Sequence, residues 1–479
     1  MLTSRRTFIR GAAAGLALQP GIAFGLAPVG FDVRRYGAKG DGRREDTAAV
    51  QAAIDACGRR GGGTVLMPAG TYLCGAIELR SHVTLHLAAG AVLRASPDRA
   101  RYGERGALVF AKGAENIAII GEGEIDGNHP AFLAPKPGGG YIFVPTFMGV
   151  YDPEAFAPGV TTPDGRPRPV LLIDCRRVRI RDIAIRRSPS WTVHLLGCED
   201  VVVDGITIDN DLLVPNCDGI DVDHCRRVRI SNCAIRAGDD GICLKASAAF
   251  RGRGPCAEIV VTNCTVTSGS AAIKLGSAGV EPIRDVIVSG CVITDSNRGL
   301  GIQNRDGSLV ENISFSDCVI STRRYPAEWW GAAEPIHISS TRRRKEQASA
   351  GRVRGINFSD IRCDGESGVY LYGEPGNALE DIVFSDVQVA VRRKTQLPGG
   401  VYDLRPGWNH QEVTPSRIAA FHAEGVNGLT LHDVQTRFEG APDPSYGSAL
   451  DARRVSGLLA KSFSGRAARA GVPDRRIQP

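Results

Sequence analysis

The sequence predicts an all-β protein that folds as a right-handed, single-stranded parallel β-helix. The first observation is a repeat, because short segments that alternate apolar and polar residues recur at intervals of 23, 27, 31, 27 and 27 residues, with two later intervals longer. Short strands with a period of about 20–30 residues are typical of a β-solenoid. The segments begin near Val178, Val201, Val228, Ile259, Val286, Ile313, Ile356, Ile382 and Leu429.

Composition supports the same fold class. Glycine is abundant (58) and methionine scarce (3), which favours tight turns and strands over helix bundles. A hydrophobic content of 43% indicates a folded chain rather than a disordered one. A chain of 479 residues is long for one globular core, but a solenoid grows by adding coils.

The chain divides into three segments. Residues 1–27 read as a twin-arginine export signal, because Arg5 and Arg6 precede an Ala-, Gly- and Leu-rich run that ends in small residues. We therefore expect a periplasmic or extracellular protein. Residues 28–466 form the predicted catalytic β-helix, and residues 467–479 a loose C-terminal tail.

Charge and hydropathy limit the classes of partner that the chain is expected to have. The net charge of +6 is mild, and no basic run is interleaved with aromatic residues in the manner of a nucleic-acid reader. No segment after the signal is apolar enough to cross a membrane. We expect no nucleic-acid partner, no membrane partner and a monomer.

The repeat array begins with a predicted helix that runs through Cys57. Asp46 or Thr47 is a suitable N-cap, and Val50, Ile54 and Cys57 fall on one helical face. A solenoid end exposes apolar side chains and unpaired strand edges, so a capping helix has a physical purpose there.

Strands are expected next at residues 83–87, 117–121 and 123–127. Residues 128–169 break the pattern, being rich in Pro, Gly and aromatic residues. A long irregular insertion inside a repeat array often forms a wall of the binding face.

Thirteen cysteines in an exported chain raise the question of disulfides. Their recurrence beside the strands favours buried thiols acting as small apolar fillers, with one or two disulfides possible. No zinc-ligand spacing occurs, and we expect no metal and no cofactor. The recurring positions are Cys175, Cys198, Cys225, Cys233, Cys264, Cys291 and Cys318.

Two acidic clusters lie one repeat apart. Asn216-Cys217-Asp218-Gly219 is followed, 21 residues after Asp218, by Asp239 and Asp240. A single aspartate in a solenoid turn would only bond to backbone amides. Adjacent coils would instead place Asp218 roughly 4.8 Å from the Asp239–Asp240 pair, where like charges raise the pKa of at least one carboxyl group. A proton donor beside ionised bases is what glycoside hydrolysis needs.

With the stretches at residues 168–169 and 188–194, these clusters resemble glycoside hydrolase family 28, the polygalacturonase-type enzymes with a pectin-lyase-like fold. The resemblance implies that Asp239 is the general acid, and that Asp218 and Asp240 position and deprotonate the attacking water of an inverting hydrolase. Asn216 belongs to the first motif. Lys245 matches a lysine that could pair with a substrate carboxylate, and its alternative interpretation is a surface lysine.

Two family motifs are altered in this chain. Residues 268–277 lack the histidine of the third motif, and Gly301-Ile302-Gln303 stands where the family has Arg-Ile-Lys. Lys274 and Arg298 are the candidate replacement cations. We therefore expect a substrate in pectin or pectin-derived oligosaccharides, such as a galacturonan or rhamnogalacturonan fragment, with exo attack favoured over endo attack.

Aromatic residues offer one further candidate. Trp330, in a Trp-Trp pair, is either a sugar-stacking platform or part of the core. His194, His337 and Trp408 are interpreted as structural.

Two other functions remain open on the same scaffold. One is a Ca²⁺-dependent polysaccharide lyase, in which the three aspartates bind the ion and an arginine such as Arg298 is the base. The other is a non-catalytic carbohydrate-binding solenoid.

Overall fold

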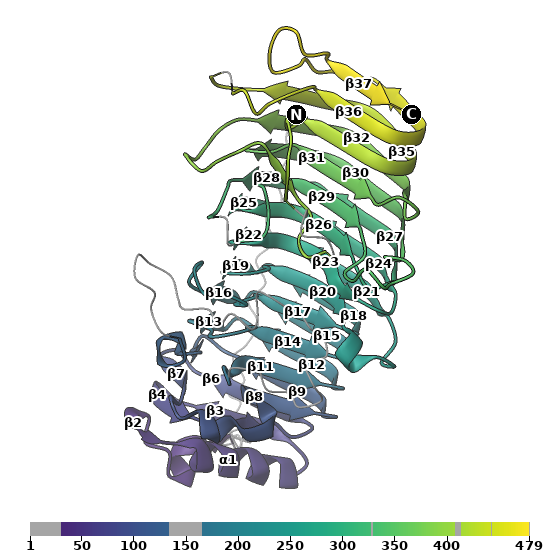
Figure 1. The fold of residues 1–479 in the computed structure, drawn as a ribbon. Helices are drawn as coiled ribbons and strands as arrows, with labels where there is room; N and C mark the ends of the chain where they lie inside the picture. Colours follow the sequence, from purple (N-terminus) through teal and green to yellow (C-terminus); the bar gives the residue numbers. More distant parts are fainter. Residues whose placement is uncertain (1–29, 134–164, 327–328, 408–412, 442, 479) are drawn as a thin grey trace, which may run out of the picture.

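The computed structural model describes residues 30–133, 165–326, 329–407, 413–441 and 443–478. The chain coils into a parallel β-helix whose coils stack from α1 (Thr47–Arg59) at one end to β37 (Arg475–Gln478) at the other (Figure 1). The predicted β-helix is confirmed. The expected signal at residues 1–27 lies outside the described residues, as does most of the expected wall at 128–169.

Most coils contribute one strand to each of three parallel sheets, and near the C-terminal end single long strands run through more than one of them. One of them, which we call the site sheet, carries the acidic clusters at its strand starts. Its strands are β5 (Ile77–Glu78), β8 (Ala107–Lys112), β11 (Arg168–Ile173), β14 (Val193–Leu196), β17 (Ile220–Asp223), β20 (Ile242–Ala246), β23 (Ala271–Gly279), β26 (Arg298–Asn304), β29 (Ile336–Ser340), β31 (Val369–Gly373), β35 (Phe421–Phe438), β36 (Leu450–Lys461) and β37.

The other two sheets complete the coils. The second contains β1 (Phe31–Asp32), β3 (Gly63–Met67), β6 (Val83–Leu87), β9 (Glu115–Ile120), β12 (Arg176–Arg181), β15 (Glu199–Asp204), β18 (Arg226–Ser231), β21 (Cys256–Thr262), β24 (Ile283–Ser289), β27 (Leu309–Ser316), β30 (Arg352–Gly365) and β32 (Leu379–Val391). The long strands β35 and β36 of the site sheet also continue this second sheet. The third contains β2 (Asp41–Glu45), β4 (Gly70–Cys74), β7 (Ala91–Ala95), β10 (Glu124–Asp126), β13 (Ala184–Arg186), β16 (Thr207–Asp209), β19 (Ala234–Ala237), β22 (Thr265–Ser268), β25 (Val292–Ser296) and β28 (Val319–Thr322).

A few elements lie outside the three sheets. An antiparallel hairpin joins β33 (Val401–Asp403) to β34 (Val413–Pro415). Short 3₁₀ turns are η1 (Val33–Tyr36), η2 (Arg99–Arg105), η3 (His129–Ala131) and η6 (Ala248–Phe250).

The repeat read from the sequence is the register of the second sheet. Val178 pairs with Val201, Val201 with Val228, and the series continues through Leu429 without a slip. These side chains point inward and are almost fully buried, so each coil adds another apolar layer to one continuous core.

All thirteen cysteines lie among the described residues as buried, unpaired thiols. Four of them stand in register on successive coils, from Cys175 through Cys198 and Cys225 to Cys256. The expected role as apolar filler is confirmed, and the disulfides that the sequence left possible do not form.

The N-terminal helix buries the face that its spacing predicts. Val50, Ile54 and Cys57 are fully buried against the first coil. Asp46 occupies the N-cap position, but its carboxylate accepts hydrogen bonds from the amides of Lys39 and Gly40 instead of capping the helix. The helix covers the open end of the solenoid.

The C-terminus differs from the expected loose tail. Residues 475–478 form β37, which pairs in parallel with β36 from Leu450 to Arg453. A segment without an apolar pattern can still pair with the open edge of a sheet through its backbone. The sequence therefore did not predict β37.

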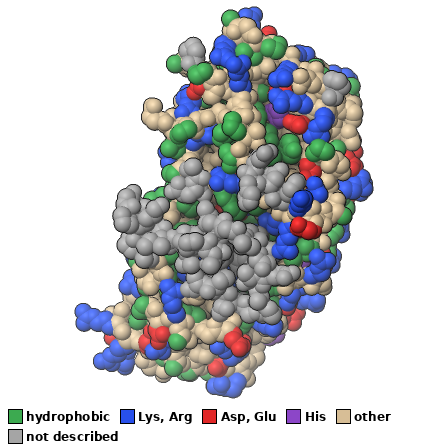
Figure 2. All heavy atoms as spheres, viewed as in Figure 1, with side chains coloured by type: hydrophobic (Ala, Val, Ile, Leu, Met, Phe, Trp, Pro, Cys, Tyr) green, Lys and Arg blue, Asp and Glu red, His purple; other side chains and the backbone are tan. Residues whose placement is uncertain are grey.

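Two global features concern the surface. No helix within the described ranges has both the length and the apolar character that crossing a bilayer requires. Lys and Arg side chains are spread over the face in Figure 2 instead of forming one continuous patch.

Candidate active site

The parallel register brings the two acidic clusters together at the start of neighbouring strands. Ile220 of β17 pairs with Ile242 of β20, so Asp218 and Asp240, each two residues earlier, occupy equivalent places on adjacent coils. The amide of Gly219 donates a 2.8 Å hydrogen bond to the carbonyl of Asp240. The expected separation of about one strand spacing is therefore the arrangement in the fold.

Burial differs among the three aspartates. Asp218 and Asp240 are each only 3% exposed, whereas Asp239 is half-buried and is the most accessible of the three. Burial, reinforced by the charges of Asp218 and Asp240, raises the pKa of Asp239 to about 7. Asp239 is thus able to carry a proton near neutrality.

Asp240 has the opposite surroundings. Its carboxylate is in contact with the ammonium group of Lys274, and it accepts hydrogen bonds from the Ser270 hydroxyl at 3.2 Å and the Ala271 amide at 3.4 Å. Burial opposes ionisation, but Lys274 and Lys245 outweigh it and hold the pKa of Asp240 below its ordinary value. An ionised base therefore lies beside a protonated acid.

Lys245 joins the cluster from β20 and is not a surface lysine. Its Nζ lies 3.2 Å from Asp218 Oδ2, contacts Asp221 Oδ1, and sits 3.7 Å from the ring centre of Trp191. Burial, together with the charge of Asp221, raises the pKa of Asp218 well above its ordinary range. Asp218 therefore keeps its proton to a higher pH than Asp240, and Asp240 is the carboxyl group that ionises first as the pH rises.

Sequence reasoning missed Asp221 and Trp191 as members of this cluster. Asp221 is fully buried on β17 beneath Lys245, and Trp191 occupies the place on the preceding coil that Asp218 occupies on its own. The available signal was a charged residue between the inward-facing Ile220 and Val222 of a strand. The guanidinium carbon of Arg168 lies 5.2 Å from the Trp191 ring centre. Arg168 comes from the coil before Trp191, whereas Lys245 comes from a later coil.

His194 is structural, as the sequence suggested. It lies edge-on to Trp191 with ring centres 4.9 Å apart, and its Nε2 is 3.7 Å from Asp223 Oδ2. Burial lowers the pKa of His194 to about 4, so the ring is neutral under most conditions.

The comparisons with known proteins identify the family of the chain. The sequence model of Glycosyl hydrolases family 28 matches residues 57–398. The chain belongs to this family. A probable polygalacturonase from Vitis vinifera is 29% identical over 277 residues, covering 52% of each chain. An exopolygalacturonase from Zea mays is 25% identical over 217 residues, covering 44% of this chain and 48% of its own. The chain spans about half the length of the curated relatives it matches.

Solved structures show the same fold. An exopolygalacturonase from Thermotoga maritima superposes with a TM-score of 0.64 at 25% identity, covering 75% of this chain and 86% of its own. The family 28 exopolygalacturonase of Yersinia enterocolitica gives a TM-score of 0.59 at 19% identity, covering 94% and 78% respectively.

Of the two altered motifs, one contacts Asp240 directly and the other lies on the strand next to Lys274. Gly301, at the place of the family arginine, pairs in register with Lys274, whose ammonium group contacts Asp240. Ser270, in the stretch that lacks the family histidine, donates its hydroxyl to Asp240. Lys274 therefore supplies a cation close to the acids.

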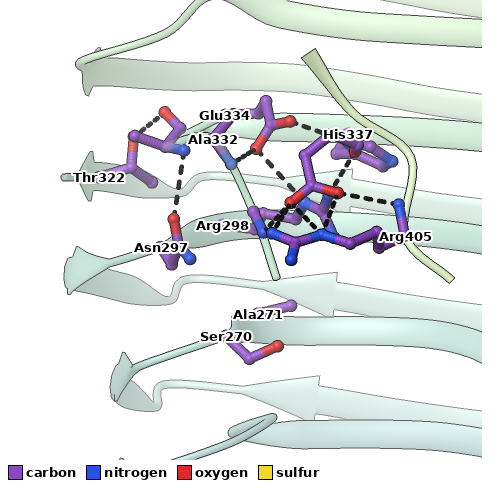
Figure 3. A network of polar contacts seen from close by, with 12 residues as sticks. Ser270, Ala271, Asn297, Arg298, Thr322, Ala332, Glu334, His337 and Arg405 are labelled. Atoms are coloured by element: carbon purple, nitrogen blue, oxygen red, sulfur yellow. Dashed lines mark hydrogen bonds and ion pairs between the residues drawn. The ribbon is translucent and has the colours of Figure 1, made fainter. Parts of the chain in front are cut away.

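Arg298, the other candidate cation, does not join the cluster. It is 2% exposed, and its guanidinium is 3.3 Å from Glu334 Oε2 and 3.7 Å from Asp403 Oδ1 (Figure 3). Asp403 also accepts hydrogen bonds from the amides of Gly331 and Arg405. Both carboxylates engage the guanidinium, so Arg298 holds chain segments together and is not placed to meet a substrate.

The remaining candidates lie at the edges of the site. Asn216 is half-buried and its Oδ1 accepts a 3.4 Å hydrogen bond from Arg166. Trp330 is half-buried beside the Arg298 network, next to Gly331. His337 is fully buried with its Nδ1 3.4 Å from Glu334, which confirms its structural interpretation. Trp408 lies outside the described residues.

The aspartates are poorly suited to Ca²⁺. Within the described ranges, no group of three or more His, Cys, Asp or Glu side chains is placed to hold a metal ion. Lysine ammonium groups already contact Asp218 and Asp240, and a divalent cation would be repelled by both of them.

Proposed function

We propose that this protein is an exported, inverting glycoside hydrolase that cleaves glycosidic bonds in pectin or pectin-derived oligosaccharides. The observation that carries the proposal is the pair of adjacent carboxyl groups whose pKa values are pushed apart, with Asp239 near 7 and Asp240 below its ordinary value. A proton donor beside an ionised base is the pairing that cleavage of a glycosidic bond requires. Membership of family 28 and the polygalacturonase relatives support the pectic substrate.

Each aspartate has one step in this mechanism. Asp239 gives its proton to the departing glycosidic oxygen. It is suited to this step because it is the most accessible of the three aspartates. Asp240 takes a proton from the water that attacks the anomeric carbon from the opposite side. Asp218, held by Lys245, hydrogen-bonds to the same water and orients it. Because the water displaces the leaving group directly, the product anomer is inverted.

A cover over the site sheet favours attack at chain ends. Gln303 donates to the carbonyl of Arg405, and Arg305 to the carbonyls of Leu404 and Pro406. These bonds hold residues 401–407, which we call the crossing segment, over β26 and β29, and Figure 3 shows it passing in front of the strands at Arg405. The crossing segment therefore lies across the site sheet on the C-terminal side of the aspartates, and this arrangement supports attack at a chain end over attack within a polymer.

Product analysis tests the proposal. Defined galacturonan and rhamnogalacturonan oligosaccharides are digested, and the first product is followed by NMR before its anomers equilibrate. We expect an inverted anomer and, with polygalacturonate, a slow fall in viscosity relative to the release of reducing ends. A retained anomer would contradict the mechanism, and rapid thinning with few reducing ends would contradict exo attack.

The lysine contacts with the aspartates disfavour the lyase alternative. A lyase would produce an unsaturated sugar that absorbs in the near ultraviolet, and its activity would be lost with a chelator. We also propose, from residues 1–27, export by the twin-arginine pathway to the periplasm or the extracellular space, and a monomeric protein. Fractionation of cells expressing the chain, with Arg5 and Arg6 replaced by lysine as the control, tests the export.

A further inference from the structure

A cavity lies on the site sheet, beyond the crossing segment. It has a volume of about 460 Å³, within the range of pockets that hold a small ligand. Four coils separate its first strand, β31, from β20, which corresponds to roughly 19 Å. Its lining includes Tyr370, Tyr372, Tyr402, His422, Glu424 and Arg453. We call this space the C-terminal cavity.

Stacked aromatic rings make the inner wall of the C-terminal cavity rigid. The ring centres of Tyr370 and Tyr402 are 4.3 Å apart and nearly parallel, and His422 stacks on Tyr370 at 5.3 Å. These three side chains are each at most 5% exposed. No hydrogen bond joins the hydroxyl of Tyr370 or Tyr372 to another residue in the part of the chain that the structure describes. Both hydroxyls are therefore able to bond to a ligand.

Among the described residues around the cavity, the charged side chains pair with one another. Arg342 Nε lies 2.9 Å from Glu374, Arg453 lies 2.7 Å from Asp451, and Arg454 lies 3.0 Å from Glu424. Each arginine therefore already has a carboxylate partner, and an acidic sugar would bring a further negative charge without a matching cation. Glu424 keeps acceptor capacity, since a carboxylate offers about four lone-pair sites.

We propose that the C-terminal cavity binds a neutral sugar residue. Aromatic edges, tyrosine hydroxyls and paired carboxylates together supply the apolar contact and the mixed donors and acceptors that a sugar ring with several hydroxyl groups requires. The crossing segment lies between this cavity and the aspartates, because Tyr402 and Leu404 line the cavity while Asp403 and Arg405 bond toward β26. The cavity is thus a second carbohydrate site, and its binding does not depend on the aspartates being catalytic.

Binding to the full chain carrying Asp239→Asn tests this proposal, because a signal from this variant reports binding without turnover at the aspartates. L-rhamnose, D-galactose and L-arabinose are titrated against galacturonate by ligand-observed NMR. We expect saturable binding of at least one neutral sugar in the millimolar range, as befits a ligand of about a dozen heavy atoms, and galacturonate at least about tenfold weaker.

Variants locate the site. Glu424→Gln should weaken the neutral sugar by about tenfold or more, because an acceptor to a sugar hydroxyl loses its charge. Tyr372→Phe, which removes one hydroxyl and keeps the ring, should weaken it by a smaller factor. Glu380→Gln is the matched control, since Glu380 also pairs with an arginine, Arg352 at 2.6 Å, but on β32 away from the cavity.

The outcomes separate cleanly. Loss of binding with Glu424→Gln and Tyr372→Phe, and not with Glu380→Gln, supports the site. No saturable binding of any neutral sugar, tighter binding of galacturonate, or equal losses with Glu380→Gln would overturn it. Failure here would leave the hydrolase proposal standing, because that proposal rests on product analysis.

Discussion

Two clusters of buried charged residues lie along the site sheet, and they differ in the ratio of carboxylates to cations. Around Asp239, four aspartates (218, 221, 239 and 240) share two lysine ammonium groups, Lys245 and Lys274. Two coils further on, Glu334 and Asp403 are matched by Arg298 and Arg405. Both clusters are largely removed from water, so burial alone does not separate them.

The balance of charge makes the difference. At Glu334, burial is outweighed by Arg298 and the pKa is held well below its ordinary value, so that carboxylate stays ionised. Near Asp239 the cations are too few, and the pKa values of the acids divide, upward for Asp218 and Asp239 and downward for Asp240. A surplus of like charge marks a site that can move protons, whereas a matched network stabilises the fold.

The largest expected effect comes from removing the acid. Asp239→Asn should lower turnover by about 10²–10⁴ with the fold retained, because a general acid contributes a factor of that size. Steady-state kinetics on a pectic oligosaccharide and circular dichroism check both parts. A control is Asp360→Asn, a turn aspartate on β30. Unchanged behaviour of Asp239→Asn would instead favour a non-catalytic solenoid.

Breaking the matched network should affect stability. Arg298→Met leaves Glu334 and Asp403 buried without their shared cation, which is expected to cost about 3–5 kcal/mol in the free energy of unfolding. Urea denaturation measures it. The control Arg352→Met removes an exposed partner of Glu380 and should cost about 0–1 kcal/mol. Equal losses in the two variants would show that the network does not stabilise this face.

Because the pKa of Asp239 is raised in the folded protein, the free energy of unfolding should depend on pH. Its pKa is raised from 3.8 to about 7, so the folded state holds that proton more tightly than the unfolded state. The stabilisation is full below pH 3.8 and is lost as the pH rises through about 7. Asp239→Asn cannot ionise and should be more stable than the wild type at about pH 8, by about 1–2 kcal/mol after allowance for partial exposure. Thermal unfolding at about pH 4 and pH 8 measures the difference, which should vanish at the lower pH.

A smaller effect is expected from Lys274. Lys274→Met removes the main cation that lowers the pKa of Asp240, so the acidic limb of the pH–rate profile should move to higher pH. Lys345→Met, which changes an exposed lysine in a surface loop, is the control. An unmoved limb would mean that Asp240 is not the base.

Much of the fold could be predicted from the sequence, because the solenoid repeats one local pattern. The inward-facing series from Val178 to Leu429 carries the register directly, and that register alone brings Asp218 beside Asp240. The face of the capping helix followed in the same way from Val50, Ile54 and Cys57.

What the sequence did not reveal depends on contacts between distant segments. Nothing in the sequence indicates a partner for Arg298. In the structure, the crossing segment, about a hundred residues later, brings Asp403 to it. Lys245 lies five residues after Asp240, but its side chain turns back one coil to Asp218 and Asp221. β37 is an added strand with no apolar alternation, so only the open edge of β36 predicts it.

The pH dependence of kcat/KM tests the central claim most directly, because that profile reports the free enzyme's acid and base. The substrate is a pectic oligosaccharide whose terminal residue carries no titratable group, so that the profile reports the enzyme alone. With it, kcat/KM should fall as the pH rises through about 7, the pKa of Asp239. That limb should be absent from the residual activity of Asp239→Asn. A rate that stayed level to about pH 9, or a limb near 7 that survived in Asp239→Asn, would contradict the assignment of Asp239 as the proton donor.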